Sequence, residues 1–544
     1  MLKYEKIIKH LKLEEKVNLL TTNQALANAM IDNYDLPLFC ILKRVDHYDV
    51  PSNRALASTW NETLIHDASK EISAHIGLDE IIGVNPNLSS NESDGYFEGK
   101  ILSNIIAGVE KGKTSACLLD VPVNNFTEEK YRDEIIIPYE IAIKEGKPTI
   151  YTSKSLDKAS VAMNEFNLEG FAIVELESEY EVIKAINENL AILYTNEAAK
   201  EIIINAVREY ERLLRLLNGN QIEKEEIDAK ICNNEIISTS QLDNVLDNYL
   251  DGLAHIDSNR LYRFKPNTSI FKNVCNESIV LLKNDAILPL DFTAHPALIG
   301  QLAKEPLVNN RFDDIYDDAV AAVDCVDFEI TGFDYGYFDN EDNPKLLNAS
   351  VELAMQSDCA IVYLGVREGN RLPNNQMELI TKLYENGVKI IAVITSDEPL
   401  IMDFDYMCSA ILYSKLSSSD FLKSSMEIIG GKINPTGKTI EYFPVNSLGV
   451  NPADPTTYKY PFGYGLSYTI VDYSDLVVRQ DGVELTLVNT GAYDIAEVVE
   501  LYVEYIDDNG VTHDRKLRGF KKVQLKSGEP ERINIEFNEY TFRS

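Results

Sequence analysis

Three compact apolar runs in the second half of the chain, CAIVYLGV, VKIIAVIT and AILYSK, restrict the possible folds most strongly. Short runs of this kind, rich in Val and Ile and without polar alternation, are typical of parallel strands buried on both faces. The intervening segment QMELITKLYENG has the spacing of an amphipathic crossover helix. The sequence therefore predicts an α/β domain over residues 266–445, with helices on both faces of its sheet.

A second series of strand-like and helix-like segments occupies the first 180 residues. SACLLDVPV, KPTIYTS and GFAIVEL are the strand-like runs, and GKILSNIIAGVEKG is one of the helices between them. This order favours a further α/β domain with parallel strands. Residues 181–265 instead hold long periodic stretches, which predict a helical connector.

The last hundred residues change character again. Residues 446–469 are rich in Pro, Gly, Tyr and Asn, a linker composition with aromatic anchors. Residues 470–544 alternate apolar and polar positions, as in VELTLVNTG, and carry the turn signals NTG and DDNG. We expect a small antiparallel β-sandwich there.

Composition restricts the partners and the compartment. The formal net charge of −36 repels phosphate backbones and anionic lipid, so neither nucleic acid nor a membrane is an expected partner. The N-terminal segment reads as an amphipathic helix and not as a signal peptide, and no apolar run is long enough to span a bilayer. Seven scattered cysteines without a CxxC pair predict reduced thiols, a cytoplasmic location and no zinc site. No P-loop, dinucleotide fingerprint or metal-ligand cluster is present, so we expect no cofactor.

Several motifs resemble those of one known family. NESIVLLKND, INPTGK and YPFGYGLSY in the second half, followed by LRGFKKVQLKSGE near the end, are similar to segments of glycoside hydrolase family 3, a group that contains many β-glucosidases. In the front half, PSNRALASTWN is similar to the barrel domain of that family. The resemblance covers nearly the whole chain.

The resemblance implies an α/β multidomain fold. Its parts are a (β/α)8-type barrel, a helical linker, an α/β sandwich, and a fibronectin type III-like β-sandwich after a Pro/Gly/aromatic linker. The corresponding boundaries in this chain are 1–215, 216–265, 266–445, 446–469 and 470–544. The front domain is barely 200 residues long, whereas ordinary barrels have about 250, so an incomplete barrel is an open alternative.

The resemblance also implies retaining hydrolysis, in which a carboxylate nucleophile and a carboxylic acid/base lie about 5 Å apart. The nucleophile motif of the family, Ser-Asp-Trp, falls on Val174-Glu175-Leu176, so Glu175 is the candidate nucleophile. A glutamate is one methylene longer than the aspartate of the family, and small positioning errors are costly in catalysis. The alternative is a solvated glutamate at the end of a strand.

The family's second-domain acid/base falls in YLGVREGNRLPNNQMELI, where Glu368 is the candidate. Arg367 and Arg371 nearby would lower its pKa, which suits an ion pair better than a proton donor. A histidine acid/base in the barrel is excluded, because no histidine occurs between His75 and His255.

Most of the residues that bind the sugar in the family are absent. The Lys-His pair falls on Leu119 and Asp120, the Thr-Ser-Tyr-Asn motif on residues 152–155 (TSKS), and the arginine expected before SNESDGYFEGK is missing. Asp120 and Asn124 remain as candidates for substrate binding. The single tryptophan, Trp60, lies in a segment that reads as barrel packing and is expected in a core rather than at a ligand.

Two hypotheses follow. The first is a non-catalytic or weakly active protein that keeps the architecture for binding, assembly or regulation. Its partners would be a carbohydrate ligand, a second copy of the chain, or an active relative. The second is an active retaining β-glycosidase that uses Glu175 as nucleophile and Glu368 as acid/base. Fold does not establish function, and the absence of the residues that bind the sugar in the family favours the first hypothesis.

Overall fold

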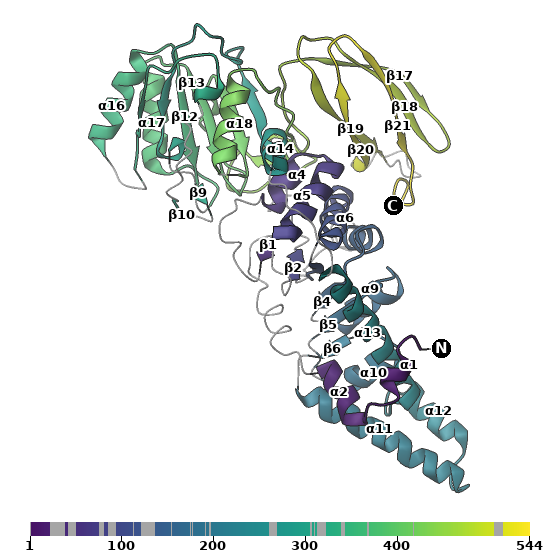
Figure 1. Ribbon diagram of the computed structural model, residues 1–544. Helices are drawn as coiled ribbons and strands as arrows, with labels where there is room; N and C mark the ends of the chain where they lie inside the picture. Colours follow the sequence, from purple (N-terminus) through teal and green to yellow (C-terminus); the bar gives the residue numbers. More distant parts are fainter. Residues whose placement is uncertain are drawn as a thin grey trace. The chain divides into compact units, whose positions relative to one another are not determined.

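The computed structural model spans residues 1–544 and forms two compact units (Figure 1). The first unit comprises Met1–Asp46, His66–Asn87 and Glu98–Asn267; the second comprises His47–Ile65, Leu88–Phe97 and Thr268–Ser544. The structure describes every residue of the chain except 1, 22–38, 42–50, 76–80, 85–93, 113, 121–135, 154, 175, 177, 191, 195–196, 261–268, 305–306, 309–310, 313–322, 339–342, 367–368, 417, 505–514 and 544. The five domain boundaries given above stay predictions.

The first unit is built on a sheet with the strand order β1-β2-β3-β4-β5-β6. β2 to β6 run parallel, and β1 is antiparallel to β2. This confirms the predicted parallel α/β series. Within the described residues the sheet ends at β1 and β6, so it does not confirm an eight-stranded barrel. The strands are β1 (Phe39–Ile41), β2 (Ile81–Val84), β3 (Ser115–Leu118), β4 (Ile150–Ser153), β5 (Phe171–Val174) and β6 (Ile192–Tyr194).

The prediction of a purely helical connector over residues 181–265 is wrong at one place. Residues 192–194 form β6, which pairs with β5 and extends the front sheet. Three apolar residues between two helices carry too little periodicity to reveal a strand, and the pairing with β5 decides their conformation.

Helices surround this sheet and extend beyond it. α11 has a pronounced apolar stripe, and its Ile203 and Val207 are fully buried, as a helix that packs on one face requires. The helices are α1 (Glu5–Ile8), α2 (Leu13–Thr21), α5 (Glu62–His75), α6 (Gly95–Lys111), α8 (Ile137–Ile141) with a π-helical turn (Ala142–Gly146), α9 (Leu156–Asn164), α10 (Glu179–Asn187), α11 (Glu197–Asn218), α12 (Lys224–Cys232) and α13 (Thr239–Arg260). α5 and α6 begin in segments of the second unit.

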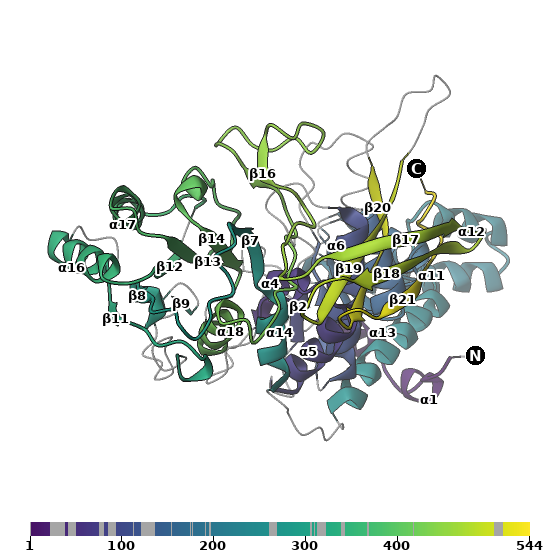
Figure 2. The same ribbon diagram turned by 90° about the horizontal axis from the view of Figure 1, so that it is seen from above.

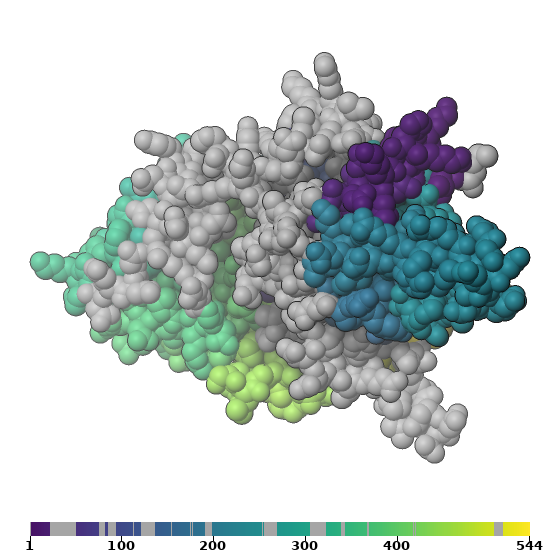
Figure 3. Space-filling model, turned by 90° about the horizontal axis from the view of Figure 1, so that it is seen from below, coloured from purple at the N-terminus to yellow at the C-terminus, as the bar shows by residue number. Residues whose placement is uncertain are grey.

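The N-terminal residues attach to α13 through charged contacts. The backbone N–H of Lys3 donates to the carboxylate of Asp247 at 2.9 Å, and the Lys16 Nζ donates to Asp243 at 2.5 Å. In the space-filling view the purple N-terminal residues lie against the teal helices of this unit (Figure 3). The expected amphipathic N-terminal helix is therefore present as two short helices.

The second unit contains a six-stranded sheet with the order β11-β8-β12-β13-β14-β7. The runs CAIVYLGV, VKIIAVIT and AILYSK form β12, β13 and β14, and every residue of β12 and β14 is buried. Only β7 is antiparallel within this sheet. The strands are β7 (Val280–Asn284), β8 (Ala297–Ile299), β11 (Gly332–Asp334), β12 (Ala360–Gly365), β13 (Ile390–Thr395) and β14 (Ala410–Ser414).

Helices cover both faces of this sheet, as predicted. α17 and α18 lie on opposite sides of the strands (Figure 2), α16 packs beside α17, and α14 packs beside α18. The four helices are α14 (Ser269–Ser278), α16 (Pro344–Met355), α17 (Asn374–Glu385) and α18 (Ser419–Ile429); the unit also contains α4 (Asn53–Ser58) and the short strands β9 (Leu307–Val308), β10 (Arg311–Phe312), β15 (Phe443–Pro444) and β16 (Tyr458–Tyr460).

The tail forms the predicted antiparallel β-sandwich. Its two sheets have the orders β17-β18-β21 and β19-β20 (Figure 2), and the alternating burial of β18 reflects the alternating sequence VELTLVN. The strands are β17 (Val471–Val478), β18 (Gly482–Asn489), β19 (Ile495–Val503), β20 (Lys516–Leu525) and β21 (Pro530–Glu536).

One aromatic cluster joins four distant parts of the second unit. The ring of Trp60 lies 4.2 Å from that of Phe97, 5.1 Å from that of Phe462 and 5.3 Å from that of Phe520, measured between centroids. Trp60 and Phe97 have no solvent exposure. Trp60 is thus a core residue, as expected, but the expectation that it packs in the barrel is wrong. Phe462 confirms that the aromatics of YPFGYGLSY serve in packing.

A buried lysine reinforces the same junction. The Lys522 Nζ on β20 forms an ion pair with Glu277 of α14 at 2.8 Å and donates to the backbone O of Thr59 at 2.6 Å. The amide of Asn61 donates to the same Glu277 carboxylate at 3.1 Å. The β-sandwich is therefore fixed to α14 and to the segment around Trp60 within this unit.

None of the helices that the structure describes is both long enough and apolar enough to cross a lipid bilayer.

We predict that Trp60→Ala lowers the free energy of unfolding by about 3–5 kcal/mol, because a large aromatic side chain leaves a cavity among three other rings. Chemical denaturation followed by circular dichroism measures this loss. Phe292→Ala is the matched control, since Phe292 is 73% exposed and its loss creates no cavity. Equal effects of the two substitutions would show that the cluster does not stabilise the unit.

Candidate functional site

The carboxyl ends of β3 and β4 bring two polar side chains together. Asp120 follows β3, Ser153 ends β4, and these neighbouring strands are parallel. The Ser153 Oγ donates to the Asp120 Oδ2 at 2.8 Å, and both residues are buried. Asp120, a predicted binding residue, therefore lies at the kind of sheet edge where the loops of barrel enzymes hold their ligands.

A lysine that sequence reasoning missed completes this cluster. Lys158 lies in the first turn of α9, where its backbone N–H donates to the N-cap Ser155. Its Nζ donates to the Asp120 Oδ1 at 2.9 Å and to the Oδ2 at 3.1 Å. A signal was available, because Ser155, two residues after the end of β4, can cap a helix whose first turn starts at this sheet edge.

This arrangement satisfies the Asp120 carboxylate internally. Both of its oxygens accept from Lys158, and one also accepts from Ser153. The side chain of Asp120 is 6% exposed and that of Lys158 is 23% exposed. A sugar hydroxyl would have to displace a charge-assisted hydrogen bond in order to reach this carboxylate.

The remaining candidates of the first unit, Asn124 and Glu175, lie outside the described residues. Two neighbours are described. The resemblance places the family's lysine at Leu119 and its tryptophan at Leu176, and the exposures of these two residues are 8% and 3%. Both positions hold buried aliphatic side chains, which cannot donate hydrogen bonds to a sugar.

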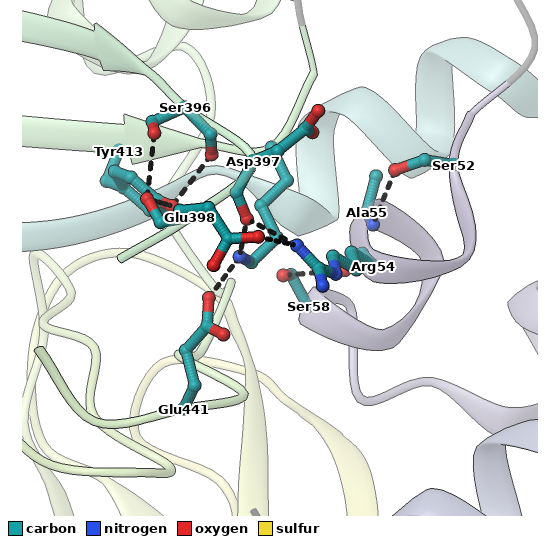
Figure 4. A network of polar contacts seen from close by, with 10 residues as sticks. Ser52, Arg54, Ala55, Ser58, Ser396, Asp397, Glu398, Tyr413 and Glu441 are labelled. Atoms are coloured by element: carbon teal, nitrogen blue, oxygen red, sulfur yellow. Dashed lines mark hydrogen bonds and ion pairs between the residues drawn. The ribbon is translucent and has the colours of Figure 1, made fainter. Parts of the chain in front are cut away.

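A second polar cluster lies at the carboxyl ends of β13 and β14 (Figure 4). The Lys415 Nζ, directly after β14, donates to the backbone O of Asp397 at 2.7 Å and forms an ion pair with Glu441. The side chains of Lys415 and Glu441 are 2% and 1% exposed. Burial lowers the pKa of Lys415, and the charge of Glu441 opposes that shift.

Arg54 of α4 joins this cluster from the front part of the chain. Its Nη1 donates at 3.0 Å both to the Glu398 carboxylate and to the backbone O of Asp397 (Figure 4). The hydroxyl of Tyr413 fixes the same loop by donating to the backbone O of Ser396 at 2.8 Å. The cluster therefore pairs each cation with a carboxylate and holds α4 against the loop after β13.

Glu368, the candidate acid/base, and Arg367 lie outside the described residues. At the base of their loop, the side-chain amide of Gln376 accepts from the N–H of Gly365 and donates to its O, each at 3.0 Å. The Arg371 Nη1 donates to Asp403 at 2.8 Å. The expectation that arginines lower the pKa of Glu368 is untested, and Arg371 already has a carboxylate partner.

In the described part of the chain, no three or more His, Cys, Asp or Glu side chains gather into a group suited to hold a metal ion. Burial raises the pKa of the Cys359 and Cys408 thiols to about 12, so these cysteines are not poised as metal ligands or nucleophiles.

Comparison with known proteins identifies both C-terminal domains. Residues 279–468 match the glycosyl hydrolase family 3 C-terminal domain, and residues 497–544 match the fibronectin type III-like domain. The crystal structure of a Bifidobacterium adolescentis GH3 β-glucosidase superposes with a TM-score of 0.75 at 20% identity, covering 98% of this chain and 90% of that one. The fold is thus that of the GH3 structures.

The names of proteins with similar sequences refer to different sugars. Thermostable β-glucosidase B of Acetivibrio thermocellus is 24% identical over 90% of this chain and 74% of its own length. An exo-α-(1→6)-L-arabinopyranosidase of Bifidobacterium breve is 23% identical over 90% of this chain and 75% of its own length. The likeness therefore indicates a family and no particular substrate.

We predict that Asp120→Asn destabilises the protein by about 2–3 kcal/mol, because the substitution removes the counter-charge of a largely buried lysine. The double variant Asp120→Leu/Lys158→Met should recover much of this loss, since it removes both charges. Thermal and urea denaturation of Asp120→Leu, Lys158→Met and the double variant measure the coupling. Glu169→Gln is the control: it breaks an ion pair with Lys147 whose side chains are each 61% exposed, and should cost less than about 1 kcal/mol. Additive effects of the Asp120 and Lys158 substitutions would contradict the pairing.

Proposed function

From the premise that this chain is a β-glucosidase-like protein of the glycoside hydrolase family 3 type, we propose that it no longer hydrolyses simple β-glycosides. In this proposal the chain keeps the architecture of its relatives for a binding or assembly role. At the front sheet, the charged side chains of Asp120 and Lys158 then serve to pair with each other and not to bind or hydrolyse a sugar.

The contact between Lys158 and Asp120 carries this proposal. A sugar-binding site needs carboxylates and amines whose hydrogen bonds remain available to hydroxyl groups. Here Lys158 and Ser153 occupy both carboxylate oxygens of Asp120. The buried Leu119 and Leu176 support the same conclusion, since they replace polar or broad aromatic side chains at matched positions.

The catalytic pair offers further support. Retaining hydrolysis depends on two carboxyl groups at a fixed separation of about 5 Å. Glu175 is longer by one methylene than the aspartate expected there, and the loop that carries Glu368 is shorter than in the family. Both changes alter a separation that the chemistry does not tolerate well.

The proposed location is the cytoplasm, supported by six described cysteines that are free thiols. The proposed partners are a carbohydrate ligand, a second copy of the chain, or an active relative. A protein with a formal charge of −36 would associate through apolar or basic surfaces of such a partner rather than through nucleic acid or anionic lipid.

The deciding experiment is the hydrolysis of a panel of aryl β- and α-glycosides, followed to very low rates. It compares the wild type with Glu175→Gln and Glu368→Gln, because glutamine keeps the shape of the side chain and removes its acid chemistry. We expect all three proteins to remain at the background rate. The Acetivibrio thermocellus β-glucosidase is the positive control for the assay.

Turnover by the wild type that Glu175→Gln abolishes would overturn this proposal. It would establish the alternative, a retaining β-glycosidase with Glu175 as nucleophile. A further loss in Glu368→Gln, restored by substrates with a good leaving group, would identify Glu368 as the acid/base, since such substrates need little protonation.

A further inference from the structure

Strand β17 is an exposed edge of the β-sandwich. It pairs with β18 and has no second partner among the strands that the structure describes. A strand of a sandwich normally turns alternate side chains into the core. β18 does so, whereas every residue from Asp472 to Val478 is exposed. Five apolar side chains of β17 and the residue before it form what we call the β17 patch: Ile470, Tyr473, Leu476, Val477 and Val478, with exposures of 69%, 50%, 68%, 40% and 69%.

The β17 patch is large for the surface of a single chain. These exposures correspond to on the order of 400–500 Å² of apolar surface, and contiguous patches of that size often mark an interaction site. Two copies that cover each other's patches would bury about 800–1,000 Å² of apolar surface together, close to the ~1,000 Å² of a specific interface even before the polar rim is added. A second copy of the chain therefore supplies enough area.

The free edge of β17 is suited to contacts between side chains. Successive side chains of a strand point to opposite faces, so the β17 patch wraps around this edge. The pairing with β18 is irregular between Ser474 and Val477, and Asp475 has a φ of +52°. Irregularities of this kind disfavour the addition of a further strand by backbone hydrogen bonds. We therefore expect an occupant that packs on the side chains of β17 and does not extend its sheet.

Charges along β17 select the occupant. The formal net charge of −36 makes two copies of the chain repel each other at long range, so a contact between them needs local cations. β17 offers both signs, because Asp472 and Asp475 are exposed in the strand and the exposed Arg479 follows it. Arg479 and Arg532 both contact the carboxylate of Glu484, at 2.8 and 2.7 Å. Two guanidinium groups thus share one carboxylate at this end of the strand.

These charges are self-complementary when two β17 strands lie antiparallel. Asp472 and Arg479 are equally far from a point between Asp475 and Leu476. A two-fold axis at that point places the Asp472 of each copy beside the Arg479 of the other, whereas parallel strands would place like charges together. Opposite charges across an interface fix its register and disfavour wrong partners. Two-fold symmetry is also the commonest symmetry of identical subunits.

We propose that the β17 patch is the contact between two copies of this chain, which pack antiparallel along β17 with Asp472 of each copy beside Arg479 of the other. The inference rests on the assembly role proposed above and adds a surface and a partner to it. Its test measures molecular mass and not hydrolysis. Glycoside turnover by a dimer would therefore overturn only the proposed function, and an inactive monomer would overturn only the inference.

Sedimentation velocity of the full chain at about 1–100 µM tests the contact. We expect a concentration-dependent dimer for the wild type. Leu476→Asp should raise the Kd of the dimer by at least about tenfold, because it places a charge in the middle of the patch. Leu448→Asp is the matched control and should leave the Kd unchanged, since Leu448 lies in the loop between β15 and β16 and is 93% exposed. A wild type that stays monomeric over this range, or equal weakening by the two substitutions, would overturn the proposal.

Charge exchange tests the antiparallel arrangement. Asp472→Arg alone places arginines together across the two-fold axis, and Arg479→Asp alone places aspartates together, so each should raise the Kd by at least about tenfold. An equimolar mixture of the two variants should associate again, because each copy then meets opposite charges at both ends of the strand. A mixture as weak as its components would contradict the arrangement. If a single variant does not fold, the double variant Asp472→Arg/Arg479→Asp decides, since it restores opposite charges and should dimerise like the wild type.

Discussion

The indole ring of Trp60 is the contact on which the second unit depends. It comes from the front part of the chain and packs among Phe97, Phe462 and Phe520, which belong to three other segments. Such rings bury large areas and prefer tilted or edge-on arrangements, so the cluster fixes relative orientation as well as adding stability. The β-sandwich and the YPFGYGLSY segment therefore share an aromatic cluster with residues from the front part of the chain.

Three ion pairs join distant segments within the part of the chain that the structure describes. Lys158 meets Asp120, Lys415 meets Glu441, and Lys522 meets Glu277, each cation with a carboxylate brought by another segment. Removing one partner from such a pair costs several kcal/mol, whereas the complete pair adds little net stability. The pairs consequently specify which segments meet. In the front sheet, one such pair joins the end of β3 to the first turn of α9.

Much of the fold was predictable, and the exceptions have physical causes. The apolar runs that became β12, β13 and β14 have the composition and length of buried parallel strands, and the alternation in VELTLVN marks β18 as a half-buried strand. The strand at Ile192–Tyr194 was missed, because three residues between helices gain their conformation from pairing with β5. The position of Trp60 was mistaken, because a packing partner four hundred residues away leaves no local pattern.

By itself the sequence determined the parallel α/β series in both halves of the chain, the alternating strands of the C-terminal sandwich, and the resemblance to one family. These properties depend on residue type and short spacing. Only the tertiary structure decided that Lys158 pairs with Asp120, that Arg54 reaches Glu398, and that Lys522 pairs with Glu277. Each of these contacts joins residues from different elements. Pairing between charges that are far apart in the sequence depends on the fold of the backbone, which no local sequence pattern encodes.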